Sequence, residues 1–302
     1  MRLLLFFLLA LFIPQEAFAW GAGVHLGLGL RVLAAPEYLP AALQALLTTY
    51  PMDYLYGCIA ADITLGKKYT HHLEHCHNWR VGRKVLEQAR EEGPAAEACA
   101  YGYLSHLAAD TIAHNYFVPY KLAMTYNTVL LNHAYWEIRA DSGVRDETWK
   151  TAQELARRDN RKLDRMLSRT LSNTIFSFRT NKQIFNSMMM ISRLRRWRKL
   201  INAMARRSKW EFDKEEHNEY MAMGREAIVS ILSDADSPYW NADPTGERAL
   251  TAAALIRKNM NLLWLDGKLR KEDSDLIISE LRKRFKLGIT DPDEILPLFT
   301  VV

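Results

Sequence analysis

Hydrophobic residues recur at spacings of three and four along most of the chain, whereas strict alternation of hydrophobic and polar positions is almost absent. Such spacings predict amphipathic helices and not β-strands. We therefore expect an all-α fold, arranged as a single multi-helix, bundle-like domain. Loops are predicted at residues 20–29, which are rich in glycine, and at 62–70. The predicted helices cover residues 28–47 with interruptions at two prolines, 81–92, 95–116, 122–141, most of 146–214, 216–233, 247–264 and one last segment.

The first nineteen residues differ from the rest of the chain. Arg2 precedes an apolar run that Pro14 ends, and Ala-Phe-Ala follows at residues 17–19. This order is typical of a cleaved signal peptide, and the run is shorter than the roughly 20 residues that span a bilayer. We predict a signal peptide over 1–19 and a mature domain over 20–302, with an uncleaved anchor as the alternative. The expected location is periplasmic or secreted, with membrane-surface association as a further option.

The chain has three cysteines, Cys58, Cys76 and Cys99, which allow at most one internal disulfide. A Cys58–Cys76 bond is one interpretation. The other is that all three are small buried residues with free thiols.

The net charge of +5 has its largest basic excess in residues 193–209. Hydrophobic residues recur at helical spacing from 184 to 204, between these basic side chains. Such a helix can lie on an anionic membrane surface, or it can pack on the core and expose a solvated basic face. Nucleic acid is a further candidate partner, with Trp197 and Trp210 as stacking platforms.

The histidines are concentrated early in the chain, with eight of nine between residues 25 and 133. His106, Asp110 and His114 follow one another at four-residue steps, so in a helix they lie within about 80° of one face. His133 and Glu137 repeat this step. Two helices that face each other in this way can hold metal ions, and imidazole with carboxylate suits zinc. A single residue of this kind could instead be a hydrogen-bonded core histidine or a capping carboxylate, but a buried Asp110 needs a cation or a partner.

These motifs resemble the zinc-dependent phospholipase C/D family, which includes bacterial phospholipases C and is related to fungal single-strand nucleases. The resemblance covers residues 20–141 by motif and the later helices more loosely. It implies an all-helical fold that holds about three zinc ions. In these relatives, the tryptophan exposed by signal cleavage binds zinc through its α-amino nitrogen and carbonyl oxygen. Here cleavage after Ala19 leaves Trp20 first, so the resemblance implies that metal loading follows export and cleavage.

The resemblance also implies a set of ligands, carried over residue by residue. They are Asp62, His77, His106 and Asp110 for one ion, Trp20, His25 and a bridging Asp110 for the second, and His114, His133 and Glu137 for the third. Four histidines are candidates for the ligand of the first ion that follows Asp62 in the chain. The fifteen-residue gap favours His77, His75 is the second choice, and His71 and His72 are also possible.

Two further positions stand out against the family pattern. The step from Asp110 to His114 is four residues, whereas bacterial phospholipases and fungal nucleases have six; the shorter step resembles the glycolipid-cleaving phospholipase D branch. Asp141 lies one turn beyond Glu137. It either supports the site from behind or forms a surface salt bridge.

The resemblance implies an exported zinc-dependent phosphodiesterase of the phospholipase C type, which hydrolyses phospholipids by metal-activated water. Zinc lowers the pKa of bound water, so no serine or cysteine nucleophile is needed, and Asp62 is implied as the general base. Glu137 is typical of the phospholipases, whereas the step from Trp20 to His25 is closer to the nucleases. The alternatives are a single-strand nuclease or nucleotidase, and a zinc-binding surface protein without catalysis. The expected partner is a phospholipid or membrane surface, and no protein partner is inferred.

Overall fold

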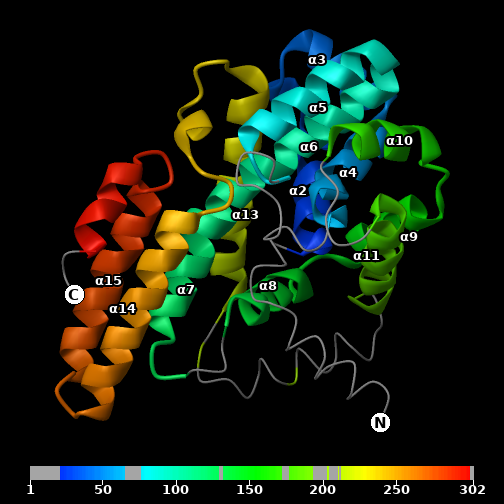
Figure 1. The fold of residues 1–302 in the computed structure, drawn as a ribbon. Coiled ribbons are helices and arrows are strands. Elements are labelled where there is room, and N and C mark those ends of the chain that lie inside the picture. The colour runs from blue at the N-terminus through cyan, green and yellow to red at the C-terminus, as the bar shows by residue number, and fades with distance from the viewer. Residues whose placement is uncertain are drawn as a thin grey trace.

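The computed structural model describes residues 21–64, 76–128, 132–171, 177–192, 203, 210 and 212–299. Within these ranges it consists of helices, turns and irregular segments, without a strand (Figure 1). The prediction of an all-α fold is confirmed. No helix in this part of the chain is both long enough and apolar enough to cross a bilayer. The predicted signal peptide, Trp20 and nearly all of the basic stretch lie outside the described residues, and the assignment of 20–302 to one domain stays a prediction.

Helix α6 (Pro94–Ile112) is the centre of the N-terminal region. Around it lie α4 (Pro51–Ala60), α5 (Trp79–Glu92) and α13 (Lys214–Ser233). Two glycines let α4 and α6 approach until their backbones touch. A Cβ on Gly57 would lie 1.9 Å from the carbonyl oxygen of Cys99, and one on Gly102 would lie 2.0 Å from that of Tyr54. This crossing places Asp62, just beyond the end of α4, beside the C-terminal half of α6.

Residues 22–29, within the predicted loop over 20–29, are helical. Helix α2 (Ala22–Leu33) begins within them, and all three of its glycines are buried. The helix packs against α4, α13 and α9 (Asp146–Arg157). This packing outweighs the cost of glycine in a helix, roughly 1 kcal/mol for each. His25 therefore lies on a buried helix instead of a loop. The short helix η1 (Pro36–Tyr38) and α3 (Ala41–Thr49) follow, with breaks near the two prolines as predicted.

The chain continues past α6 through the π-helical turn η5 (Ala113–Phe117) into α7 (Val118–Met124). The predicted helix end before Pro119 is wrong, because this proline lies in the first turn of α7, where a missing N–H is tolerated. A single helix over 122–141 is also wrong. The reason is a local cap: Asn132 Oδ1 accepts a hydrogen bond from Tyr135 N (3.1 Å) and starts a separate helix, α8 (His133–Ser142).

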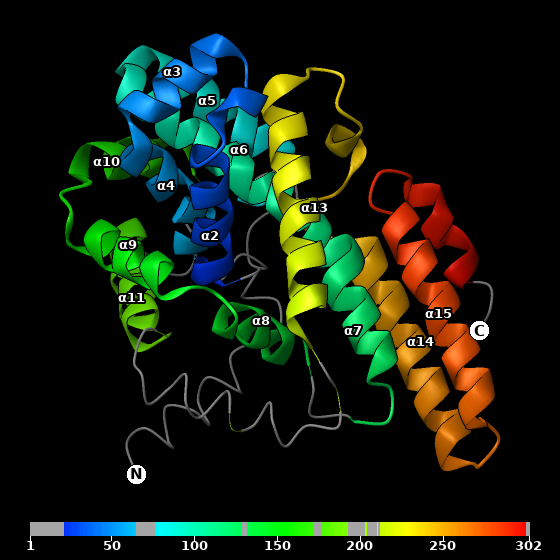
Figure 2. The ribbon, with the colours of Figure 1, turned by 180° about the vertical axis from the view of Figure 1, so that it is seen from behind.

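The C-terminal region adds a second group of helices. Its elements are η6 (Pro238–Asn241), α14 (Glu247–Leu265), α15 (Lys271–Leu287) and η7 (Pro292–Phe299). Three further elements precede α13, namely η2 (Ala61–Ile63), α10 (Arg161–Thr170) and α11 (Phe178–Ser192). Helix α7 packs against both α14 and α15, and this group stands beside α13 (Figure 2). The segment between α13 and α14 returns to the far end of α6, where it meets η5.

The cysteines are all buried and free, so the disulfide interpretation is wrong. Burial raises the pKa of the Cys58 thiol to about 12, so this thiol is protonated at neutral pH. Cys76 Sγ lies 3.3 Å from Nδ1 of His77.

Candidate metal centre

Four side chains from three parts of the chain converge beside the C-terminal half of α6. Asp62 comes from η2, His77 from the segment before α5, and His106 and Asp110 from α6. His77 Nε2 lies 3.0 Å from His106 Nε2, 3.3 Å from Asp62 Oδ1 and 3.2 Å from Asp110 Oδ2. His106 Nε2 lies 3.2 Å from Asp110 Oδ2 and 3.8 Å from Asp62 Oδ1. All four residues are buried.

These separations match what zinc requires. Ligands about 2.0–2.1 Å from a tetrahedral ion lie about 3.3 Å from one another. The five distances between the four side chains run from 3.0 to 3.8 Å. One ion could therefore be held by the four donors that the sequence predicts for the first site.

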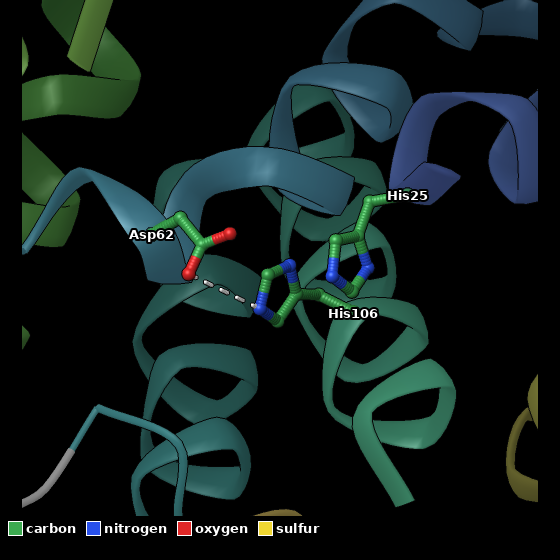
Figure 3. Close-up of side chains that lie close together, drawn as sticks. All are labelled: His25, Asp62 and His106. Carbon is green, nitrogen blue, oxygen red and sulfur yellow. Dashed lines mark ion pairs between the residues drawn. The ribbon is translucent and has the colours of Figure 1, made fainter. Parts of the chain in front are cut away.

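Both oxygens of Asp110 face histidine nitrogens. Oδ2 faces His77 and His106, whereas Oδ1 lies 3.3 Å from Nε2 of His25. The ring of His25 stacks on that of His106 with a centroid separation of 3.8 Å and an interplanar angle of 14°. Figure 3 shows these two rings side by side, with Asp62 on the other side of His106. A carboxylate placed in this way can bridge two ions, one on each oxygen.

A third cluster lies farther along the same helical path. His133 Nε2 lies 2.6 Å from Oε1 of Glu137, and His114 Nε2 lies 3.9 Å from the same oxygen. The two imidazole rings meet edge to face at 5.4 Å. Glu137 is buried, and neither of its oxygens has a hydrogen-bond donor within the described residues. Such a carboxylate is costly unless a cation or a proton satisfies it, which fits a metal at this point.

Backbone carbonyls orient two of the histidines. His106 Nδ1 donates to the carbonyl oxygen of Cys58 (2.9 Å), and His114 Nδ1 donates to that of Pro244 (2.7 Å). A carbonyl can only accept, so each neutral ring carries its proton on Nδ1 and presents a lone pair on Nε2. Metal-binding histidines are held in this way.

Burial and neighbouring charges set the protonation of the cluster. Burial opposes ionisation of Asp110, but the charge and hydrogen bond of His106 in its protonated form, together with a hydrogen bond from His25, outweigh it and hold the pKa of this carboxyl well below its usual range. Burial lowers the pKa of His25, and it lowers that of His133 to about 4. Both rings are therefore neutral near pH 7, as a ligand must be. Burial raises the pKa of Glu137 well above its usual value, so a nearby cation would favour its ionised form.

The comparisons with known proteins agree with this chemistry. A family model described as zinc-dependent phospholipase C matches residues 24–181, which is more than half of the 302 residues. The chain belongs to the zinc-dependent phospholipase C family. No curated protein and no solved structure gave a match. Family membership makes zinc the expected metal, and the donors of the three clusters suit it.

The structure brings together most of the residues predicted from the family pattern. Three groups could each hold an ion, namely His25 with Asp62 and His106, His77 with His106 and Asp110, and His114 with His133 and Glu137. Trp20 and the alternatives His71, His72 and His75 lie outside the described residues. The ligand role of each residue, and the number of ions, stay predictions.

Sequence reasoning about this member of the family missed two features of the site. One is the π-helical turn η5, which carries His114; such turns interrupt an α-helix and are frequent at functional sites. The other is the contact of His114 with Pro244, which lies 130 residues later and outside the family match. Asp141 Oδ1 accepts a hydrogen bond from Val24 N (2.9 Å), which favours a supporting role for Asp141 over a surface salt bridge.

Proposed function

We propose that this member of the family is an exported phosphodiesterase that hydrolyses phospholipids in the manner of phospholipase C. The observation that carries the proposal is Asp110, whose two oxygens face separate histidine groups at distances that suit zinc. Zinc, when bound, supplies a water of lowered pKa and neutralises the phosphate oxygens of the substrate. The location and the cleavage type rest on the sequence and on the family.

The chain's own residues would have two tasks. His77, His106, Asp62 and Asp110 orient their donor atoms toward one point, which removes most of the entropy cost of assembling the site. Asp62 is 7% exposed, so it is the carboxylate of this group nearest to solvent. We propose that it accepts the proton of the attacking water, as a general base within hydrogen-bonding distance can do.

An exposed hydrophobic run supports a lipid substrate. Four consecutive residues at the end of α14, Leu262 to Leu265, are 42–66% exposed, and Trp264 is among them. Lys268 and Lys271 follow in the connection to α15 and its first turn. A convex tip of leucine and tryptophan beside lysines is typical of segments that enter a membrane interface. The predicted basic helix over 184–209 lies largely outside the described residues and adds nothing to this argument.

The nuclease alternative has less support. One of its two proposed stacking platforms, Trp210, is partly buried, and its indole Nε1 donates to Thr128 Oγ1 (3.0 Å). Its carbonyl oxygen accepts a hydrogen bond from Arg139 Nη1 (2.8 Å). Trp210 also packs against the hydrophobic core, so it offers less of its ring face to a base than an exposed platform would. The other platform, Trp197, lies outside the described residues.

The test is made on exported, N-terminally sequenced protein, with bound zinc measured by elemental analysis. The protein is then offered phosphatidylcholine vesicles and single-stranded DNA in parallel, with Asp110→Asn as the inactive reference. Diacylglycerol as product supports the proposal, and phosphatidic acid would replace it with D-type cleavage. Cleavage of DNA alone would favour the nuclease, and zinc without turnover would favour the non-catalytic alternative. A folded, correctly cleaved protein without zinc would refute all three.

A further inference from the structure

The contact between His114 and Pro244 joins two distant parts of the chain. His114 lies in η5, and Pro244 lies in the segment between α13 and α14, beyond the end of the family match at residue 181. The hydrogen bond from His114 Nδ1 to the Pro244 carbonyl oxygen is 2.7 Å long, and His114 is buried. A residue outside the matched region therefore decides which nitrogen of a candidate ligand carries the proton.

The segment that supplies this carbonyl is a tight, self-bonded turn. Asp243 Oδ1 accepts a hydrogen bond from Thr245 N (2.9 Å), and Oδ2 accepts from Thr245 Oγ1 (2.6 Å) and from Glu247 N (3.3 Å). The backbone nitrogen of Gly246 donates to the carbonyl oxygen of Asp243 (3.0 Å). These bonds hold the Pro244 carbonyl in one direction.

A second side chain ties the turn to η5. Asn115 Nδ2 donates to the carbonyl oxygen of Asp243 (2.7 Å) and to that of Thr111 (2.9 Å). Asn115 follows His114 directly, so two neighbouring residues of the π-helical turn bind two consecutive carbonyls, those of Asp243 and Pro244. The pair resists rotation of His114 away from Glu137 and His133.

Gly246 lets the turn come this close. Its φ of +62° belongs to the left-handed region, and a Cβ on it would lie 2.4 Å from the Cβ of His114 and 2.4 Å from the carbonyl oxygen of His114. Real side chains do not approach so closely, and the backbone of η5 cannot yield as a flexible side chain would. Only glycine fits at this position.

From these contacts we infer that the turn 243–246 is a positioning element of the third metal cluster, with Gly246 and Asn115 as its positioning residues. It holds His114 as the Nδ1–H tautomer and aims Nε2 at the metal position. This inference rests on the proposed function, because it takes His114 to be a zinc ligand. The new element is that the C-terminal region is needed for a complete metal site, although all of the described candidate ligands precede that region.

The test compares Gly246→Ala with Gly267→Ala. Gly267 also has a positive φ, +66°, but a Cβ there would meet nothing within 4 Å. Both variants carry the backbone cost of a non-glycine residue, and only Gly246→Ala displaces the turn from His114. Zinc affinity is measured by chelator competition on the full chain. Gly246→Ala should lower the affinity for one zinc ion by about 10- to 100-fold and leave the affinity for the others unchanged, as substitutions of residues that orient a metal ligand do. Gly267→Ala should keep all the zinc.

Two further measurements separate positioning from general damage. In ¹⁵N NMR spectra, His114 should be the Nδ1–H tautomer in the parent protein and lose that preference in Gly246→Ala. Asn115→Leu keeps a similar side-chain volume but removes the hydrogen bond from Asn115 to the Asp243 carbonyl, so it should lower the affinity for the same zinc ion. This variant decides the question if Gly246→Ala does not fold. Equal metal loss in both glycine variants, or unchanged affinity in Gly246→Ala and Asn115→Leu, overturns the inference. A parent protein that binds no zinc overturns the proposed function first.

Discussion

The region that matches the family model and the region that follows it contribute to the metal centre in different ways. Every described candidate ligand lies in residues 24–181, on α2, η2, α6, η5, α8 and the segment just before α5. Residues 212–299 contribute no ligand that we predict, but their backbone holds His114 through Pro244. For His114, the donor atom and the carbonyl that aims it thus come from different regions of the chain, whereas His106 is aimed by Cys58 within the matched region.

The same two regions also differ in what they bury. In the matched region, charged and polar groups such as Asp110 and His106 are completely enclosed. At the end of α14, leucines and a tryptophan are exposed instead. Both arrangements are costly without an external partner, which would be a metal for the first and, under the proposed function, a lipid surface for the second. The comparison suggests one region for chemistry and the other for substrate approach.

The largest effect is expected at the shared carboxylate. Asp110→Asn removes the charge that faces two histidine groups, so zinc content should fall at both neighbouring positions. Activity should fall by more than about 100-fold, because substitution of a residue that only orients a ligand already costs up to roughly 100-fold. Asp53→Asn is the matched control, because Asp53 is also buried but pairs with Arg158 at 3.0 Å instead of with the histidines. It should lower stability and leave zinc content unchanged; equal zinc loss in both variants would contradict the role of Asp110.

The next effect concerns the processed terminus. A chain that keeps two extra residues before Trp20 has an amide in place of the free amine, so we expect it to lose one zinc ion and at least about 10-fold in activity. Trimming the extension with an aminopeptidase should restore both. Full zinc content with the extension in place would show that Trp20 is not a ligand and would leave His25 and Asp110 as the only predicted donors at the second position.

A smaller effect should separate the exposed tip from the metal centre. Leu265→Ser removes a side chain that is 66% exposed, and we expect vesicle binding to weaken by up to about 10-fold, while turnover of a soluble short-chain substrate stays the same. Leu287→Ser is the control, since Leu287 is 57% exposed but lies at the other end of α15, about 25 Å along the helix. Equal losses in both variants, or a change in self-association instead, would argue against insertion of this tip.

The smallest effect is a pH dependence within the matched region. Burial raises the pKa of Asp141 to about 7 from its ordinary 3.8. Between these values the unfolded chain is ionised while the folded carboxyl is protonated, so the stability that Asp141 contributes is present at low pH and lost as the pH rises toward about 7. In metal-free protein, the parent should therefore lose stability relative to Asp141→Asn as the pH rises from 4 toward 7, by at most about 1.4 kcal/mol per pH unit. Parallel unfolding curves across this range would refute the raised pKa.

Much of the site was predictable because its ligands follow local rules. The four-residue steps of His106, Asp110 and His114, and of His133 and Glu137, are consequences of helical periodicity, and the structure brings these residues into clusters. The choice of His77 among four histidines came from its distance to Asp62 along the chain, and His77 does lie 3.3 Å from that carboxylate. The helix over Gly23 to Gly29 was missed, because propensity argues against it and only packing on neighbouring helices supports it.

The sequence by itself determined the all-α fold, which depends on helical periodicity, and the family resemblance supplied the candidate ligands. Only the tertiary structure decided how the donors are oriented. Asp110 faces two histidine groups because α2 and α4 cross α6 there, and His114 keeps its proton on Nδ1 because a turn 130 residues away presents a carbonyl to it. Periodicity acts between neighbouring turns of one helix, whereas the direction of a lone pair depends on contacts between segments far apart in the chain.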